Sequence, residues 1–251
     1  MGIDRAERRR ATGGVSGRRA SPAPHLGRLT GRPDRLDRPS WRSRLALAAV
    51  GPVPVTLVGL STFGWFSFPR LAIVAIPPAV LLLVIVLRTD RAARRPATHA
   101  LIAGLIATFL YDLLRWSFLL LGWMDRDPIP HLGTALGLEP GWVFGYLWRF
   151  VGNGGGLALT FVALGAGGRR LGAVYGLAVC SGLLAVLVWA PNGQADLFPL
   201  TGATLVVAVG GHLTYGVVLG TLVRYRRRPG GGCTGPRPRR SARVEDAARG
   251  S

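Results

Sequence analysis

Six apolar stretches, separated by connections of alternating charge, dominate this sequence. They cover roughly residues 45–66, 71–87, 98–123, 142–164, 171–190 and 200–223. Each is close to the ~20 residues that a helix needs to cross a bilayer. Of the 251 residues 49% are hydrophobic, and these are concentrated in the six stretches. The sequence therefore predicts an all-α domain over residues 45–223, a bundle of six transmembrane helices.

The arginines predict how this bundle is oriented. All 31 basic residues are arginine: 12 precede residue 45, four lie between Arg88 and Arg95, two are Arg169 and Arg170, and nine follow residue 223. These segments alternate with connections that carry few arginines. By the positive-inside rule both termini are expected in the cytoplasm. We expect a multi-pass protein of a prokaryotic cytoplasmic (inner) membrane.

Two basic tails flank the predicted membrane domain. Residues 1–44 and 224–251 are rich in Arg, Pro, Gly and Ser and lack apolar periodicity, so both are expected to be disordered cytoplasmic segments. The first tail is too long and too polar for a signal peptide, so the first span is expected to stay as an uncleaved anchor. Orientation and anionic lipid head groups explain the formal charge of +19 more simply than nucleic acid does.

Prolines and one connection add detail to this prediction. Pro52 and Pro54 in the first span and Pro77-Pro78 in the second remove backbone donors, so both spans are expected to kink. The acidic connection 124–141 is long enough to fold over the mouth of the bundle as a lid. An ordinary connector is at least as good an interpretation.

Polar residues inside the predicted spans form the candidate site. Asp112 and Arg115 are three residues apart, as are His212 and Tyr215, and Arg149 and Asn153 are four apart, so each pair shares one helix face. At the helical rise they lie about 10–18 Å below the predicted external boundary. The spacing predicts one polar layer shared by the third, fourth and sixth spans. Its members are Tyr111, Asp112, Arg115, Arg149, Asn153, His212 and Tyr215.

Two interpretations of this layer remain open. Asp112 can neutralise one arginine and fix the helix register, a purely structural role. Alternatively, two arginines against one carboxylate leave a positive charge that a small anionic or strongly polar ligand, or a lipid phosphate, would satisfy. Catalysis is less favoured: His212 has a suitable ordinary pKa for proton transfer, but no nucleophile is paired with a base.

Glycines and cysteines complete the analysis. Gly152 and Gly154–Gly156 predict either close helix packing, the favoured interpretation, or a backbone opened toward a cavity. Gly172-x-x-x-Gly176 and Gly216-x-x-x-Gly220 predict small faces on the fifth and sixth spans. Cys180 and Cys233 predict neither a disulfide nor a metal site, and no motif indicates a cofactor.

The sequence resembles small polytopic membrane proteins of bacteria and archaea that have no known function. The resemblance covers about residues 98–223 and is carried by three motifs: Ala103-Gly104, Tyr111-Asp112-x-x-Arg115 and Gly211-His212-x-x-Tyr215-Gly216-x-x-x-Gly220. It departs at Trp148-Arg149, where those proteins have a histidine beside an aromatic residue. The resemblance implies a shared polar layer and no particular substrate or activity.

These observations favour a protein that binds or passes a small polar or anionic ligand, or a lipid head group, within the membrane. The alternative is a non-catalytic assembly or accessory subunit, and a membrane-embedded lipid-modifying enzyme comes third. Expected partners are membrane lipids, anionic ones included, and a small polar ligand, without nucleic acid. A homo-oligomer is compatible with the sequence.

Overall fold

The computed structural model describes residues 39–223, and over that range the chain is helical, with no strand. Five of its helices are long and apolar enough to cross a membrane. They are the joined pair α1 (Trp41–Val50) and α2 (Val53–Ser61), α3 (Phe68–Thr89), α4 (Arg91–Leu120), α8 (Arg169–Trp189) and α10 (Gly202–Leu222). These helices are those of a multi-pass membrane protein. The predicted disorder before residue 39 and after residue 223 lies outside the described residues.

The first helix begins at Trp41 rather than at residue 45, because polar contacts hold its start. The Ser40 hydroxyl caps the helix by accepting from the Ser43 N–H at 3.1 Å. Asp90, which caps α4, also accepts from the Ser40 N–H at 2.9 Å and from the Ser43 hydroxyl at 2.7 Å. Residues 41–44, assigned to a disordered tail from the sequence, are therefore helical.

The same contacts act on the charge of Asp90. Burial raises the pKa of this carboxyl, but hydrogen bonds from the Ser43 hydroxyl and from the backbone at Ser40 and Ala93 outweigh burial and hold the pKa below its ordinary value. The carboxylate thus joins the starts of α1 and α4 in its charged form.

Proline has different effects in the first two spans. The first is interrupted at Gly51-Pro52, between α1 and α2, as the sequence predicted. Gly51 also lies against α7 (Gly156–Ala163), so closely that a Cβ on Gly51 would overlap the Thr160 hydroxyl and the Gly156 carbonyl. In the second span, α3 continues through Pro77 and Pro78.

The predicted fourth span contains a π-helix. Three segments follow one another from Gly141 to Ala163: α6 (Gly141–Leu147), the π-helix η2 (Trp148–Gly155) and α7. No single one of them is long enough to be counted with the five membrane helices. In a π-helix the backbone hydrogen bonds run from residue i to i+5, and such turns are frequent at functional sites.

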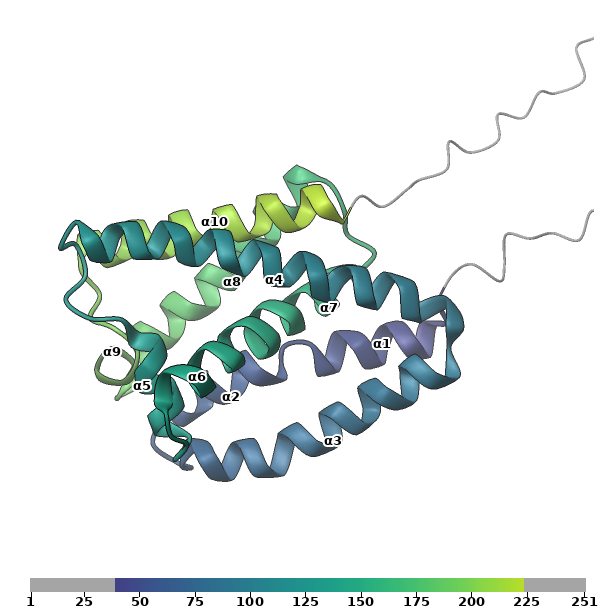
Figure 1. Cartoon of the computed structure of the whole chain (residues 1–251), viewed down its shortest axis with the longest axis horizontal. Coiled ribbons are helices and arrows are strands. Elements are labelled where there is room, and N and C mark those ends of the chain that lie inside the picture. The colour runs from purple at the N-terminus through teal and green to yellow at the C-terminus, as the bar shows by residue number, and fades with distance from the viewer. Residues whose placement is uncertain (1–38, 224–251) are drawn as a thin grey trace, which may run out of the picture. The chain divides into compact units, whose positions relative to one another are not determined.

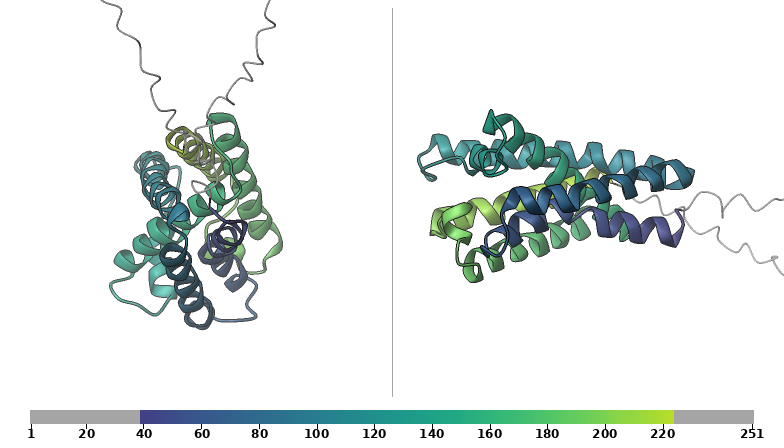
Figure 2. Two further views of the ribbon diagram at one scale, coloured as in Figure 1. Left: turned by 90° about the vertical axis from the view of Figure 1, so that its right-hand side faces the viewer. Right: turned by 90° about the horizontal axis from the view of Figure 1, so that it is seen from below.

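Glycines bring the fifth and sixth apolar helices into backbone contact. A Cβ on Gly172 or Gly176 of α8 would overlap the carbonyl oxygens of Gly216 or His212 on α10. The Gly168 N–H, at the start of α8, donates to the Gly220 carbonyl at 2.9 Å. The two glycine motifs therefore face each other, and α10 lies between α8 and α4 (Figures 1 and 2).

Two short helices lie in connections. They are α5 (Pro128–Ala135), capped by the Asp127 carboxylate, and α9 (Gly193–Asp196). Gly133 of α5 packs on Gly141 and Gly145 of α6, where a Cβ would overlap backbone atoms. The connection 124–141 thus contains a helix, α5, which packs against the start of the next span (Figure 1).

Candidate functional site

A cavity of about 450 Å³ lies between α2, α4, α5, η2, α8 and α10. This volume is within the range of pockets that hold small molecules, about 300–1,000 Å³. Most of its lining is apolar. The polar or charged side chains in the lining are Thr56, Tyr111, Arg115, Arg149, Asn153, Asp196, Thr204 and His212.

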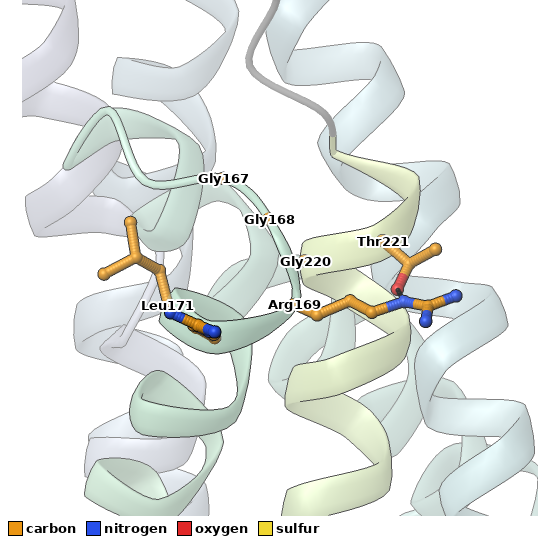
Figure 3. Close-up of a pocket in the computed structure, with 7 residues that line it drawn as sticks. Gly167, Gly168, Arg169, Leu171, Gly220 and Thr221 are labelled. Carbon is orange, nitrogen blue, oxygen red and sulfur yellow. Dashed lines mark hydrogen bonds between the residues drawn. The ribbon is translucent and has the colours of Figure 1, made fainter.

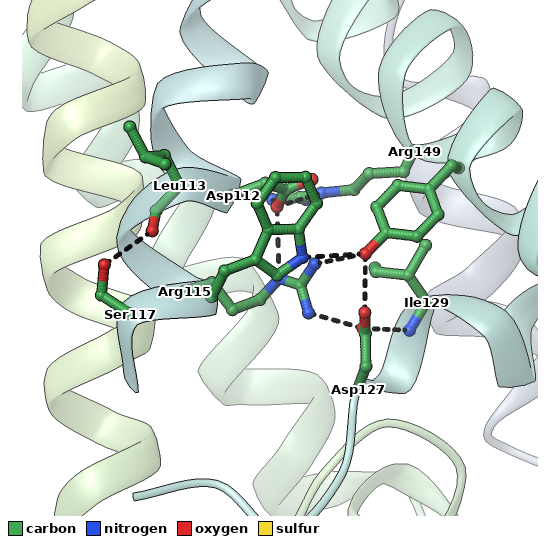
Figure 4. A network of polar contacts seen from close by, with 9 residues as sticks. Asp112, Leu113, Arg115, Ser117, Asp127, Ile129 and Arg149 are labelled. Carbon is green, nitrogen blue, oxygen red and sulfur yellow. Dashed lines mark hydrogen bonds and ion pairs between the residues drawn. The ribbon is translucent and has the colours of Figure 1, made fainter. Parts of the chain in front are cut away.

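Asp112 lies at the centre of an ion-pair network beside this cavity (Figure 4). Its side chain is fully buried, at 0% exposure. The oxygen Oδ1 accepts from Arg115 Nε at 3.3 Å, from Arg149 Nε at 3.3 Å and from Arg149 Nη2 at 3.1 Å. The carboxylate therefore joins α4 to the π-helix η2. Within the described residues, the Asp112–Arg149 pair is the only ion pair between these two elements.

Arg115 has a second carboxylate partner, Asp127, which the sequence analysis did not place in the layer. Arg115 Nη1 donates to Asp127 Oδ1 at 2.5 Å and Nη2 donates to the Tyr146 hydroxyl at 3.1 Å. That hydroxyl donates to Asp127 Oδ2 at 2.6 Å and accepts from Trp116 Nε1 at 2.9 Å. The expectation of two arginines against one carboxylate is therefore wrong: two guanidinium groups face two carboxylates.

Arg115 and Arg149 both line the cavity, and Arg149 is the one that keeps a nitrogen without a partner. Its guanidinium lies over the Tyr111 ring at 4.2 Å from the centroid, and its side chain is 17% exposed. Nε and Nη2 are held by Asp112, while Nη1 makes no hydrogen bond to any of residues 39–223. One nitrogen of the guanidinium therefore has no partner among these residues, on a side chain that lines the cavity and whose plane is fixed by Tyr111 and Asp112.

His212 and Asn153 lie in the same wall. His212 Nδ1 is 2.8 Å from the Ala208 carbonyl, so Nδ1 carries the proton and Nε2 of the neutral ring is an acceptor. The ring meets Tyr111 edge-on, with centroids 5.1 Å apart. Asn153 Oδ1, Asp112 Oδ2 and Thr108 Oγ1 are buried without a hydrogen-bond partner in the described part of the chain. Unpartnered buried oxygens are costly, and of these three residues Asn153 is the one that lines the cavity.

Tyr215 stands apart from the cavity. Its hydroxyl donates to the Gly154 carbonyl of η2 at 2.7 Å, and it is not among the lining residues. Gly154 also packs so closely on Thr108 that a Cβ would overlap the threonine hydroxyl. Of the two interpretations of the glycine-rich segment, close packing against α4 is observed. The Gly154 carbonyl faces Tyr215 instead of the cavity, and none of Gly152 and Gly154–Gly156 lines it.

The predicted layer is thus brought together, apart from Tyr215, and two of its members were missed. Asp127 was assigned to a connection, although an Asp before Pro128 is a helix-start signal that places its carboxylate at the first turn of α5. Tyr146 sits within an apolar stretch without a charged neighbour. Its position three residues before Arg149 is the only sequence signal that could have indicated it.

A second hollow, of about 550 Å³, lies where α8 begins and α10 ends (Figure 3). Gly167, Gly168, Arg169 and Thr221 line it, and Arg169 Nε donates to the Thr221 hydroxyl at 3.3 Å. Both arginines at this turn are exposed, and no buried polar group points into the hollow. The cavity at Arg149 is therefore the better candidate site.

Metal ligands do not gather in the described region: no three His, Cys, Asp or Glu side chains of residues 39–223 lie close enough together to hold an ion. Comparison with protein families, with characterised proteins and with solved structures finds no match.

Proposed function

We propose that this chain is a six-span protein of a prokaryotic cytoplasmic membrane which binds or passes a small polar or anionic ligand, or a lipid head group. The span that the five long helices leave out is the fourth in chain order, the continuous helical run of α6, η2 and α7, which joins the same bundle through contacts with α1 and α4. Counting this run makes six crossings, so both termini lie on one side.

The arginine distribution supports a cytoplasmic location for both termini. Of the 31 arginines, 27 lie in the two tails or in the links around Arg91 and Arg169. Among the other four, Arg115 and Arg149 belong to the buried network, and Arg126 lies exposed, donating to the Ala195 carbonyl at 2.9 Å. No strongly basic connection is left on the opposite side.

One observation carries the ligand proposal: Arg149, whose Nη1 has no partner in residues 39–223, lines a cavity of ligand size. Asn153 and His212 line the cavity on the same side. A guanidinium that is fixed by a carboxylate and an aromatic ring loses little freedom when it binds an oxygen ligand. An acceptor oxygen at Nη1 would use the free donor and leave the Asp112 pair intact.

Ligand-dependent stabilisation tests this proposal. Anions and anionic lipids are added to the purified chain in neutral detergent, and the unfolding temperature is measured. A ligand present at 100 times its Kd raises the free energy of unfolding by about 2.7 kcal/mol. Arg149→Lys is the variant of choice, because lysine keeps a charge near Asp112 but lacks the planar fork. Arg126→Lys is the matched control, since Arg126 lies outside the cavity. The proposal fails if no anion or anionic lipid stabilises the parent, or if both variants respond as the parent does.

A non-catalytic assembly or accessory subunit is the second candidate, and the direct Asp112 bridge favours it. Because each carboxylate is held by a guanidinium, the network joins α4 to η2 and to the start of α5 without any ligand. A purely structural network would make Arg149→Lys less stable in the same measure with and without added ligand. That outcome would select the second candidate.

A further inference from the structure

We infer that the ligand of the Arg149 cavity is a single-chain amphiphile with an acidic head group, and that it reaches the cavity sideways, between α2 and α8. This inference rests on the proposed function and names the class of ligand. It follows from three features of the cavity. One wall is polar and the other apolar, the polar wall has a donor and an acceptor without partners, and some lining residues are also exposed at the surface of the bundle.

The walls divide into a polar side and an apolar side. Arg115 and Arg149, Tyr111, Asn153 and His212 come from α4, η2 and α10. Facing them, α2 and α8 contribute Thr56, two glycines and otherwise apolar side chains: Val55, Val58, Leu60, Val179, Leu183 and Val186. A water needs two to four polar partners, which the apolar side does not supply. A hydrated inorganic anion fills only the polar side, whereas a head group with a hydrocarbon chain matches both.

Among the polar residues that line the cavity are one donor and one acceptor without a partner in residues 39–223. Arg149 Nη1 has an unused N–H, and His212 Nε2 has an unused lone pair because Nδ1 donates to Ala208. A fully ionised anion would accept from Arg149 Nη1, but it has no proton to donate to His212 Nε2 and would repel the lone pair there. A carboxylic acid or a singly protonated phosphate monoester carries both an acceptor oxygen and an O–H. Because the network already balances two arginines with two aspartates, a head group of low net charge is matched.

The exposed lining residues locate the side opening. Gly182 of α8 and Thr56 of α2 both line the cavity and are also exposed at the surface of the bundle. A Cβ on Gly182 would meet no atom within 4 Å. Farther along α2 the two helices meet: a Cβ on Gly59 would lie 3.3 Å from Val186 Cγ2, and the Asn192 N–H donates to the Thr62 carbonyl at 3.0 Å. The opening therefore lies at the level of Thr56 and Gly182, among lipid chains.

A spin-labelled fatty acid in nanodiscs of phosphatidylcholine tests the inference with the full chain. We expect an immobilised component in the electron paramagnetic resonance spectrum. Unlabelled fatty acid or a straight-chain alkyl phosphate should displace it. The matched straight-chain alcohol should be at least about tenfold weaker, because its single oxygen would have to donate to His212 and accept from Arg149 at one point, whereas the acid divides these two roles between two oxygens. Acetate and inorganic phosphate should not displace it.

Gly182→Leu tests the route, because the added side chain has room at the opening and blocks it. The immobilised component should fall at least about tenfold, with an unchanged unfolding temperature. Gly202→Leu is the matched control: a Cβ there also meets nothing within 4 Å, but Gly202 lies outside the cavity lining. Binding equal to the parent in Gly182→Leu would overturn the side route.

The remaining outcomes separate this inference from the proposed function. Displacement by acetate or inorganic phosphate as effective as by the lipid acids would leave the proposed function standing and refute the amphiphile. Equal displacement by acid and alcohol would refute the acidic head group. No immobilised component, together with Arg149-dependent stabilisation by soluble anions, would again refute only the inference, whereas absence of both would refute the inference and the proposed function together.

Discussion

Replacing Asp112 by asparagine should destabilise the bundle more than any other single change of charge in it. Asparagine keeps the shape and one acceptor oxygen but leaves Arg149 without a carboxylate and Arg115 with Asp127 alone. A single interhelical polar contact in membranes contributes about 0.6 kcal/mol on average. An uncompensated buried charge in a soluble protein costs about 3–5 kcal/mol. The three N–H contacts of 3.1–3.3 Å are long for charged pairs, so we expect a loss of about 3 kcal/mol, at the lower end of that range.

The assay is reversible unfolding of the purified chain in mixed micelles, with Asp125→Asn as control. Asp125 is an exposed carboxylate in the connection before α5, so its neutralisation should change stability by less than about 0.5 kcal/mol. Combining Asp112→Asn with Arg149→Gln should cost less than the sum of the two single changes, because the second change removes the charge stranded by the first. Equal stability of the Asp112 and Asp125 variants would refute the account of the network.

Three further predictions address topology, packing and pH. Cysteine placed at Ala135, in exposed α5, should react with an impermeant thiol reagent in intact cells while Cys233 does not; labelling of Cys233 would reverse the proposed orientation. Gly216→Leu should cost about 3 kcal/mol or more in the same unfolding assay, because its side chain would overlap the backbone of α8; a smaller loss would mean that the two helices separate freely. Since the folded-state pKa of Asp90 is depressed, its contribution to stability is present above the unfolded pKa of about 3.9 and is lost as the pH falls through the lower folded value. Ser43→Ala should move the pKa of Asp90 upward in an NMR titration, and an unchanged pKa would contradict the contact.

The membrane helices could be predicted from sequence because each depends on its own composition. Apolar length sets α3, α4, α8 and α10 to within a few residues at most ends, and the break at Pro52 follows from a missing backbone donor. The start of α4 at Arg91 rather than residue 98 did not follow from hydropathy, because its first turns carry arginines and depend on the Asp90 cap. A search for apolar stretches does not detect helix ends that are made of polar residues.

The polar layer could be predicted only in part, for a related reason. Helical spacing places Asp112 and Arg115 on one face whatever the fold. Asp127 reaches Arg115 only because α5 folds back on α6. The two helices meet through the backbones of their glycines, and no pattern of side chains in the sequence predicts this contact. The π-helix was likewise unpredictable, since its hydrogen bonds depend on what α4 and Tyr215 offer across the helix interface.

Because Arg149 and Asn153 both lie in the π-helix, their relative positions depend on the number of residues in this segment as much as on which residues they are. A turn closed from i to i+5 holds one residue more than an α-helical turn. Removing Gly152 would let the turn close with α-helical hydrogen bonds, so that Arg149 and Asn153 would be separated by three residues instead of four. These two side chains, which line the cavity, would then take different positions relative to each other. A deletion scan through residues 148–155 would therefore be as informative as substitution, and a homologue with one residue fewer at this point would carry a different cavity.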